Sequence, residues 1–352
     1  MINKYFYKNP TFTETTWALL AVMRFFLAFI VIYGHLYFQI LGLKAEPLEF
    51  IIDLGAKAAV MTFLLISGIS IGHSYAKNKD GFIERRFLRI YPLYFIAVLF
   101  GVLLQYYLSS PYELPNSTMI AAGNLTSIAN FLLLQGIAAI TITYNGPLWS
   151  IGVEVFLYLM VPLLMYLKSR YIFILILISM YAFTFLNYTL LYGYSNLIWA
   201  WPFLIGFLIA AKRKPLFAVP LLVLSVCIVH YQQKVFAESW SVLLAVFSIL
   251  VCFIAMYVKL NFSKYTILVL NFLGTISYPI YIFHLPLYLI LYYFGVRESY
   301  VFISLVVVLS MALNYVFDVW LKKIFWKPVV DVIAKQTKKV QGNVIFNRTL
   351  KT

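Results

Sequence analysis

The stretch from Trp17 to Leu41 reads WALLAVMRFFLAFIVIYGHLYFQIL and is long enough to cross a membrane as a single helix. A helix rises 1.5 Å per residue, so these 25 residues extend over about 37 Å, against roughly 30 Å for the hydrocarbon core of a bilayer. The stretch is too long for the apolar part of a secretory signal peptide, and no small-residue cleavage site follows it. We therefore expect it to stay in the mature protein as the first membrane span.

The rest of the chain has the same character. Of its 352 residues, 63% are hydrophobic and 11% charged, whereas soluble domains carry about 25% charged residues. This composition excludes a water-soluble globule, a disordered chain and a disulfide scaffold, and it predicts an all-α polytopic membrane protein. About ten transmembrane helices are expected, near residues 17–41, 54–72, 91–108, 147–167, 171–187, 198–211, 216–231, 239–258, 267–292 and 301–321.

The positive-inside rule decides the topology, because cytoplasmic loops carry the excess of Lys and Arg. An eleventh apolar segment, 126–144, is interrupted by polar residues. With ten spans and both termini cytoplasmic, 22 basic residues lie inside and three outside, whereas counting 126–144 as a span leaves nine inside and 16 outside. We therefore predict that 109–146 is an external loop with a partly embedded segment. The formal charge of +15 then reflects topology, and no nucleic-acid partner is expected.

Ionisable residues inside spans cost roughly 2.5–3.5 kcal/mol each on insertion scales, so each requires a reason. Lys57 and Asp318 lie near span ends and can reach the interface. Arg24 and His35 lie deeper, 11 residues apart, which puts them on one face of the first helix with about 16 Å between them along the axis.

Counting residues from the span ends predicts two layers within the bundle. His35, Glu154 and His284 fall at similar depth below the external surface, while Arg24 and Ser67 share a depth nearer the cytoplasm. One alternative is that these residues only fix helix packing through hydrogen bonds. Another is that His35 and His284 are the axial ligands of a haem. Several such groups on separate spans favour a site over packing.

A basic cluster lies in the loop between the second and third spans. Arg85, Arg86 and Arg89 stand at the expected inner mouth of the bundle, and the rigid guanidinium fork suits phosphate oxygens. Arg85 and Arg89 are one helical turn apart and could hold a diphosphate from two directions. The alternative is ordinary positive-inside anchoring or contact with anionic membrane lipids.

Five segments along the chain gather the residues discussed above into short motifs: RFFLAFIVIYGH (Arg24–His35), FLLISGI (Phe63–Ile69), RRFLRIYPLY (Arg85–Tyr94), WSIGVE (Trp149–Glu154) and SYPIYIFH (Ser277–His284). In these motifs and their order the chain resembles the acyltransferase-3 family of integral membrane acyltransferases, which modify bacterial surface polysaccharides and related molecules. Phe25, Val22 and Ile69 depart from residues that many members carry. The resemblance covers about residues 17–325 and implies a membrane acyltransferase domain over 1–325, with a short basic cytoplasmic tail over 326–352.

The resemblance implies transfer of an acyl group, usually acetyl, from cytoplasmic acyl-CoA to a hydroxyl of a saccharide or glycolipid at a bacterial cytoplasmic membrane. Acyl-CoA would be a co-substrate, with no permanently bound cofactor and no metal. The expected catalytic residues are His35, as general base or as a covalent acyl carrier, and Glu154, which would orient it. Acyl-CoA would be bound by Arg24, Ser67, Arg85, Arg86 and Arg89, and the acceptor side supported by Trp149, Ser150, Tyr278, Tyr281 and His284.

A transporter or flippase for a lipid-linked or polymeric saccharide is the alternative from another class. Intramembrane charges and aromatic-lined paths would also suit transport. Such a protein would not consume acyl-CoA, so the two functions are distinguishable with the purified protein.

Overall fold

A computed structural model describes residues 7–41, 49–108, 110–186, 195–236 and 239–332. Lys4, Lys44 and residues 333–352 of the predicted tail lie outside these ranges. The described chain is built almost entirely of helices, and the sheet consists of one two-stranded hairpin.

The helices follow one another with short connections. The first half contains α1 (Glu14–His35), its π-helical continuation η2 (Leu36–Leu41), α2 (Glu49–Asp53), α3 (Ala56–Lys77), α4 (Phe82–Tyr107), α5 (Asn124–Phe131), the 3-10 helix η3 (Thr143–Leu148) and α6 (Trp149–Tyr166). The second half contains α7 (Ser169–Phe185), α8 (Ser195–Ile198), α9 (Ala200–Ala210), α10 (Pro215–Phe236), α11 (Ser241–Tyr257), α12 (Lys264–Tyr293), α13 (Ser299–Leu313) and its π-helical continuation η4 (Asn314–Trp326).

The predicted fold class is confirmed. Among the described residues, six helices are long and apolar enough to cross a membrane: 14–41, 56–77, 82–107, 143–166, 264–293 and 299–332. Four shorter apolar helices, 169–185, 200–210, 218–232 and 241–257, coincide with the remaining predicted spans. The chain is thus an all-α polytopic membrane protein.

The segment 126–144 does not form a crossing helix. Its only α-helix, α5, has eight residues and covers about 12 Å, too little for a bilayer. The amide of buried Asn130 donates to the carbonyls of Thr126 (2.8 Å) and Ile140 (2.9 Å), which folds the segment back on itself. The same loop contains an antiparallel hairpin of β1 (Tyr112–Leu114) and β2 (Ser117–Met119), which the sequence did not predict.

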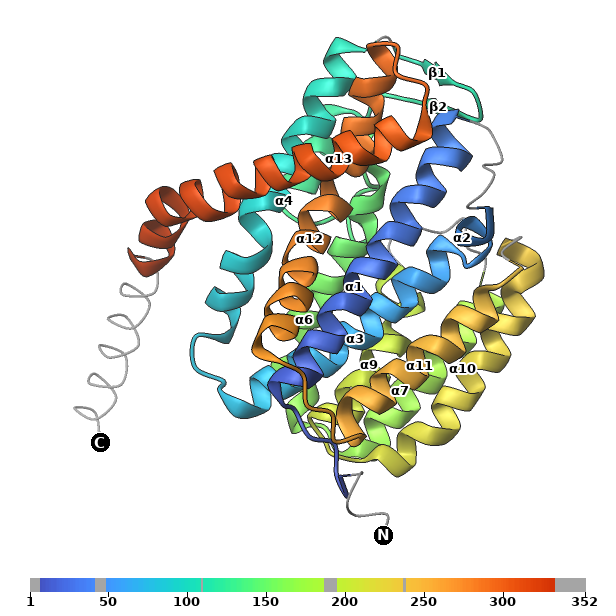
Figure 1. Cartoon of the computed structure of the whole chain (residues 1–352), viewed down its shortest axis with the longest axis vertical. Coiled ribbons are helices and arrows are strands. Elements are labelled where there is room, and N and C mark those ends of the chain that lie inside the picture. Colours follow the sequence, from blue (N-terminus) through green and yellow to red (C-terminus); the bar gives the residue numbers. More distant parts are fainter. Residues whose placement is uncertain (1–6, 42–48, 109, 187–194, 237–238, 333–352) are drawn as a thin grey trace, which may run out of the picture.

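The centre of the bundle is formed by α1 and α12, which lie side by side with α3 and α6 close by (Figure 1). Helix α3 packs on α9 backbone to backbone, because Gly68 and Gly206 present no side chain there. A Cβ on Gly68 would lie 2.0 Å from the carbonyl oxygen of Phe203, and one on Gly206 would lie 2.2 Å from that of Leu65. These two glycines fix the position of α3, which carries Ser67.

The last long helix extends well past the predicted end at residue 321. Helix α13 and η4 cross the bundle obliquely (Figure 1), and the helical run continues to Val332. Asp318 was expected near a span end, but it lies inside this run. Lys322, one turn later, neutralises it through an ion pair of 2.9 Å between Nζ and Oδ1. Burying an ion-paired carboxylate in an apolar environment costs less free energy than burying an unpaired one.

Candidate active site

A cavity of about 90 Å³ opens among α1, α3, α4, α6 and α12, and we call it the inner cavity. It combines charged and hydroxyl-bearing side chains within an otherwise apolar bundle. The predicted site residues that line it are Arg24, Arg89, Ser150, Glu154, Tyr278 and Tyr281.

Glu154 is the centre of a hydrogen-bonded cluster in the inner cavity. Ser67 Oγ donates to its Oε1 at 2.5 Å, and Tyr158 Oη donates to the same oxygen. The Ser67 and Tyr158 hydroxyl oxygens are 2.8 Å apart. Two hydroxyl donors on one carboxylate oxygen fix the orientation of the Glu154 side chain.

The structure does not bring Glu154 and His35 together: among the described residues Glu154 is hydrogen-bonded to Ser67 and Tyr158, and no hydrogen bond joins it to His35. Counting from the predicted end of the second span at residue 72 placed Ser67 near the cytoplasm and away from Glu154. Helix α3 instead runs on to Lys77, so Ser67 lies at mid-helix and meets Glu154. Because the last turn of α3 is polar, the apolar run in the sequence ends before the helix does.

Arg24 lies between the inner cavity and a second cavity on the N-terminal side of α1. Its Nη2 donates to Ser70 Oγ on α3 at 2.9 Å. Arg24 and His35 both face the inside of the bundle, as their spacing predicted, and they are separated by about 16 Å along α1.

His35 and His284 are in direct contact, with 3.2 Å between His35 Nδ1 and His284 Nε2. His284 Nδ1 lies 2.6 Å from the Tyr281 carbonyl oxygen, and His35 Nδ1 lies 2.9 Å from that of Val31. A carbonyl oxygen can only accept, so with both rings neutral each Nδ1 carries the proton. The single Nδ1 proton of His35 is then shared between the Val31 carbonyl oxygen and His284 Nε2, and both of these accept it.

This assignment leaves His35 Nε2 with its lone pair. His284 is completely buried, whereas His35 keeps part of its surface open. A neutral imidazole with an unprotonated, accessible Nε2 is the form that a general base or a nucleophile requires. The contact also excludes the haem interpretation, because axial ligands lie on opposite sides of the iron and cannot bond to each other.

His284 is placed to orient His35, and its replacement should separate that role from packing. We expect His284→Leu to lower kcat about 10- to 100-fold with little change in KM. His284→Gln should recover part of the loss, because its amide oxygen can accept from His35 Nδ1. Steady-state kinetics of the two variants test this role, and equal kcat values for His284→Leu and His284→Gln would contradict it.

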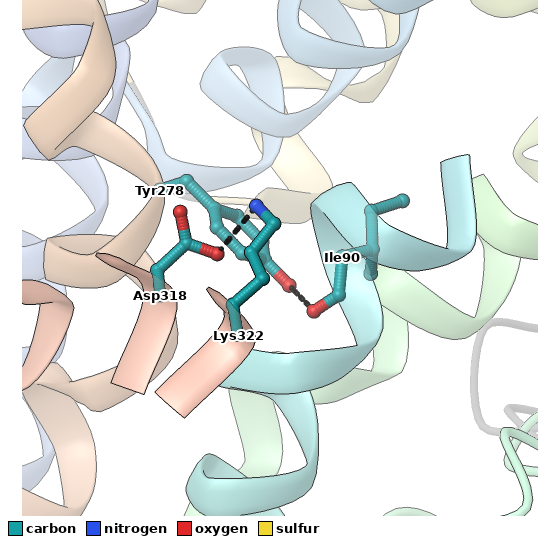
Figure 2. Close-up of polar contacts among 4 residues, drawn as sticks. All are labelled: Ile90, Tyr278, Asp318 and Lys322. Atoms are coloured by element: carbon teal, nitrogen blue, oxygen red, sulfur yellow. Dashed lines mark hydrogen bonds and ion pairs between the residues drawn. The ribbon is translucent and has the colours of Figure 1, made fainter. Parts of the chain in front are cut away.

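Tyr281 connects the inner cavity with the histidine pair. Its Oη lies 2.7 Å from Ser150 Oγ in the cavity wall, and its ring centroid lies 6.0 Å from that of His284. Tyr278 also lines the cavity, and its hydroxyl donates to the Ile90 carbonyl oxygen at 3.0 Å (Figure 2). Trp149 does not line this cavity and packs on Trp199, with 4.9 Å between ring centroids.

Figure 2 shows the Asp318–Lys322 ion pair beside Tyr278, whose hydroxyl points to the Ile90 carbonyl. The last helix thus covers the ring that closes this part of the inner cavity. Trp326 at the end of η4 also packs on Tyr91 of α4, with a centroid distance of 5.3 Å. These contacts hold α4, α12 and η4 together around Tyr278.

The second cavity, here called the basic cavity, has a volume of about 390 Å³. It is bordered by α1, α3 and the start of α4. It shares Arg24 and Arg89 with the inner cavity, so the two are neighbours. Five cationic side chains line it: Arg24, Lys77, Arg85, Arg86 and Arg89.

The three arginines predicted in a loop lie instead in the first turns of α4, and they differ in their contacts. Arg85 is held by the loop before α4, since its guanidinium donates to the carbonyl oxygens of Asn78 (2.7 Å) and Asp80. Arg86 donates through Nη2 to Ser74 Oγ at 3.2 Å, while its buried Nε has no partner. An unpaired buried donor is costly, and a phosphate oxygen in the cavity would satisfy it.

Two residues of this region escaped sequence analysis. Tyr158 follows Glu154 by four residues, so their shared helix face was a usable signal. Asn145 lies in η3, and its buried amide donates to the carbonyls of Ala97 (3.1 Å) and Ile282 (3.0 Å), tying α4 to α12. Its spacing gave no hint of this, because the two carbonyls come from distant segments. Within the described residues, no group of three or more His, Cys, Asp or Glu side chains could hold a metal ion.

The fold and the two cavities define a polytopic membrane protein with a buried polar site that adjoins a basic cavity. A family model for an acyltransferase domain matches residues 18–319, which is most of the chain. The chain belongs to this family, acyltransferase 3, and is a membrane acyltransferase. No curated protein and no solved structure matches it.

Proposed function

We propose that the protein transfers an acyl group, most simply acetyl, from acyl-CoA to a hydroxyl of a saccharide or glycolipid at a bacterial cytoplasmic membrane. The observation that carries the proposal is the adjacency of the basic and inner cavities through Arg24 and Arg89. The first suits the phosphates of CoA, and the second leads toward the histidine pair. The family membership supports the reaction class.

The acyl-CoA phosphates would bind in the basic cavity, and the pantetheine arm would extend past Arg24 toward Tyr281. His35 Nε2 would take the proton of the acceptor hydroxyl. At the same time the oxygen of that hydroxyl would attack the carbonyl carbon of the thioester. The carbon–sulfur bond then breaks, and the CoA thiolate leaves and takes up a proton. General-base catalysis of this kind typically contributes ~10²–10⁴-fold.

The same nitrogen also supports a covalent route. Nε2 would attack the thioester carbonyl, the carbon–sulfur bond would break, and the CoA thiolate would leave. The acceptor oxygen would then attack the acyl-imidazole, break its carbon–nitrogen bond and pass its proton to the thiolate. A label trapped on His35 by rapid quenching after incubation with labelled acetyl-CoA, absent when an acceptor is added, distinguishes the covalent route. Glu154 stands apart from His35 in both routes. With Ser67 and Tyr158 it would supply a fixed negative charge near Arg24 and Arg89.

The test is release of free CoA from acetyl-CoA by the protein in membranes that contain its acceptor. The expected result is release with the wild type and not with His35→Ala. A saccharide transporter would release none, so unchanged acetyl-CoA with folded wild-type protein would contradict the proposal. Mass spectrometry of surface glycans from cells with and without the protein then identifies the acceptor.

Replacing two of the arginines at the start of α4 is expected to act on donor binding. Arg85→Ala combined with Arg86→Ala should raise the KM for acyl-CoA about tenfold and leave kcat nearly unchanged, because phosphate contacts are equal in ground and transition states. Lys79→Ala is the matched control, since Lys79 is an exposed cation in the short connection before α4 and does not line the cavity. If Lys79→Ala raised the KM for acyl-CoA by the same factor, the arginine cluster would serve only as an ordinary positive-inside anchor.

A further inference from the structure

The basic cavity has an aromatic wall in addition to its charges. Trp17 of α1 and His73 of α3 both line it. Their ring centroids are 5.4 Å apart, and Phe12 packs on both, at 5.4 Å from Trp17 and 4.2 Å from His73. Three rings from two helices and the N-terminal segment thus form one rigid surface at a cavity that is otherwise cationic.

The arrangement is unusual for a site that binds phosphate alone. Five cations would suffice for phosphate groups, and no Asp or Glu lines the cavity. Aromatic rings add nothing to phosphate binding, but they stack well on the flat face of a nucleobase. Trp17 and His73 are each partly exposed, so both offer surface to a ligand.

The cations are distributed around this wall. Arg24 lies seven residues from Trp17 on α1, which is about two turns deeper, while Lys77 lies four residues from His73 on α3. Arg86 lines the same cavity near the end of α3, where its Nη2 donates to Ser74 Oγ. A ligand with a base on the aromatic wall would therefore have phosphate partners both toward the inner cavity and toward the end of α3.

We infer that the basic cavity binds the nucleotide end of the acyl donor, with Trp17 and His73 holding the adenine ring and the surrounding Arg and Lys side chains binding its phosphates. This inference rests on the proposed function and adds a reason for donor choice. The enzyme would select an adenine nucleotide thioester over acyl thioesters that lack the nucleotide. An anionic lipid headgroup, which carries phosphate without a base, would gain nothing from the rings.

The inference is tested by comparing two donors in one variant. S-acetyl-4′-phosphopantetheine has the thioester and one phosphate of acetyl-CoA but no adenosine. Trp17→Ala should raise the KM for acetyl-CoA roughly tenfold and leave the KM for the shorter donor nearly unchanged. Any general loss of folded protein lowers kcat for both donors equally and does not move the ratio of their KM values.

Further variants sharpen the comparison. Trp17→Phe keeps a ring and should retain most of the preference for acetyl-CoA. Trp240→Ala, which removes an exposed tryptophan far from the cavity lining, should have no effect on the ratio. Adenosine 3′,5′-bisphosphate should compete with acetyl-CoA for the wild type and about tenfold more weakly for Trp17→Ala.

Three results have clear meanings. A KM ratio unchanged by Trp17→Ala would overturn the nucleotide assignment while the acyltransferase function stands. Equal KM values of the wild-type enzyme for the two donors would also overturn the nucleotide assignment. A folded wild-type protein that uses neither donor would overturn the proposed function itself, and the nucleotide site with it.

Discussion

His35→Ala should reduce acyl transfer at least ~10²-fold while leaving an inserted and stably expressed protein. The reason is that His35 Nε2 is the unprotonated nitrogen of the histidine pair, whereas His284 Nε2 is engaged with His35 Nδ1. Turnover per mole of folded protein, with acetyl-CoA as the donor, measures the effect. Both the general-base and the covalent route lose their reacting atom in this variant.

The matched control is His230→Ala, because His230 is exposed on α10 and away from both cavities. It should keep wild-type turnover. If His35→Ala retained more than about a tenth of the wild-type rate, His35 would be a packing residue, and the catalytic assignment would have to move elsewhere.

Gly68→Ala is expected to have the largest effect on stability. The added Cβ would lie 2.0 Å from the Phe203 carbonyl oxygen, so α3 and α9 must separate. An alanine in a helix would otherwise stabilise by up to ~1 kcal/mol, whereas overpacking of this kind costs typically ~1–3 kcal/mol and sometimes more. We expect a clear fall in the unfolding temperature of the detergent-solubilised protein, with loss of activity because adjacent Ser67 moves away from Glu154.

Gly123→Ala makes the same chemical change where nothing lies within 4 Å of the new Cβ, and it should be neutral. Gly206→Ala should resemble Gly68→Ala, since its Cβ would lie 2.2 Å from the Leu65 carbonyl oxygen. Equal unfolding temperatures for Gly68→Ala and Gly123→Ala would show that the two helices can adjust without cost.

Much of the fold was predictable, because apolar length and the distribution of basic residues are properties of single segments. The first span, the failure of 126–144 to cross as a helix, and the inward face shared by Arg24 and His35 all follow from spacing along one chain segment. The arginine cluster was found for the same reason, since its cations are consecutive in sequence.

The contacts between segments were harder to predict from the sequence. Depth counting assumes that a helix ends where its apolar run ends, and α3 shows why this fails: its last turn is polar, so Ser67 was placed too close to an end. The contact between His35 and His284 depends on how α1 packs against α12. The aromatic wall also escaped notice, because Phe12, Trp17 and His73 come from two distant segments and none carries a charge that would mark it.

We propose that the donor enters by the basic cavity on the cytoplasmic face and is consumed at His35. The side of the membrane from which acetyl-CoA is used tests this most directly. Sealed membrane vesicles of both orientations are supplied with external acetyl-CoA, which its charges keep from crossing, and free CoA is measured against His35→Ala vesicles as background. The account predicts release by inside-out vesicles, with right-side-out vesicles active only after permeabilisation. Release by intact right-side-out vesicles, or equal release by the His35→Ala vesicles, would contradict it.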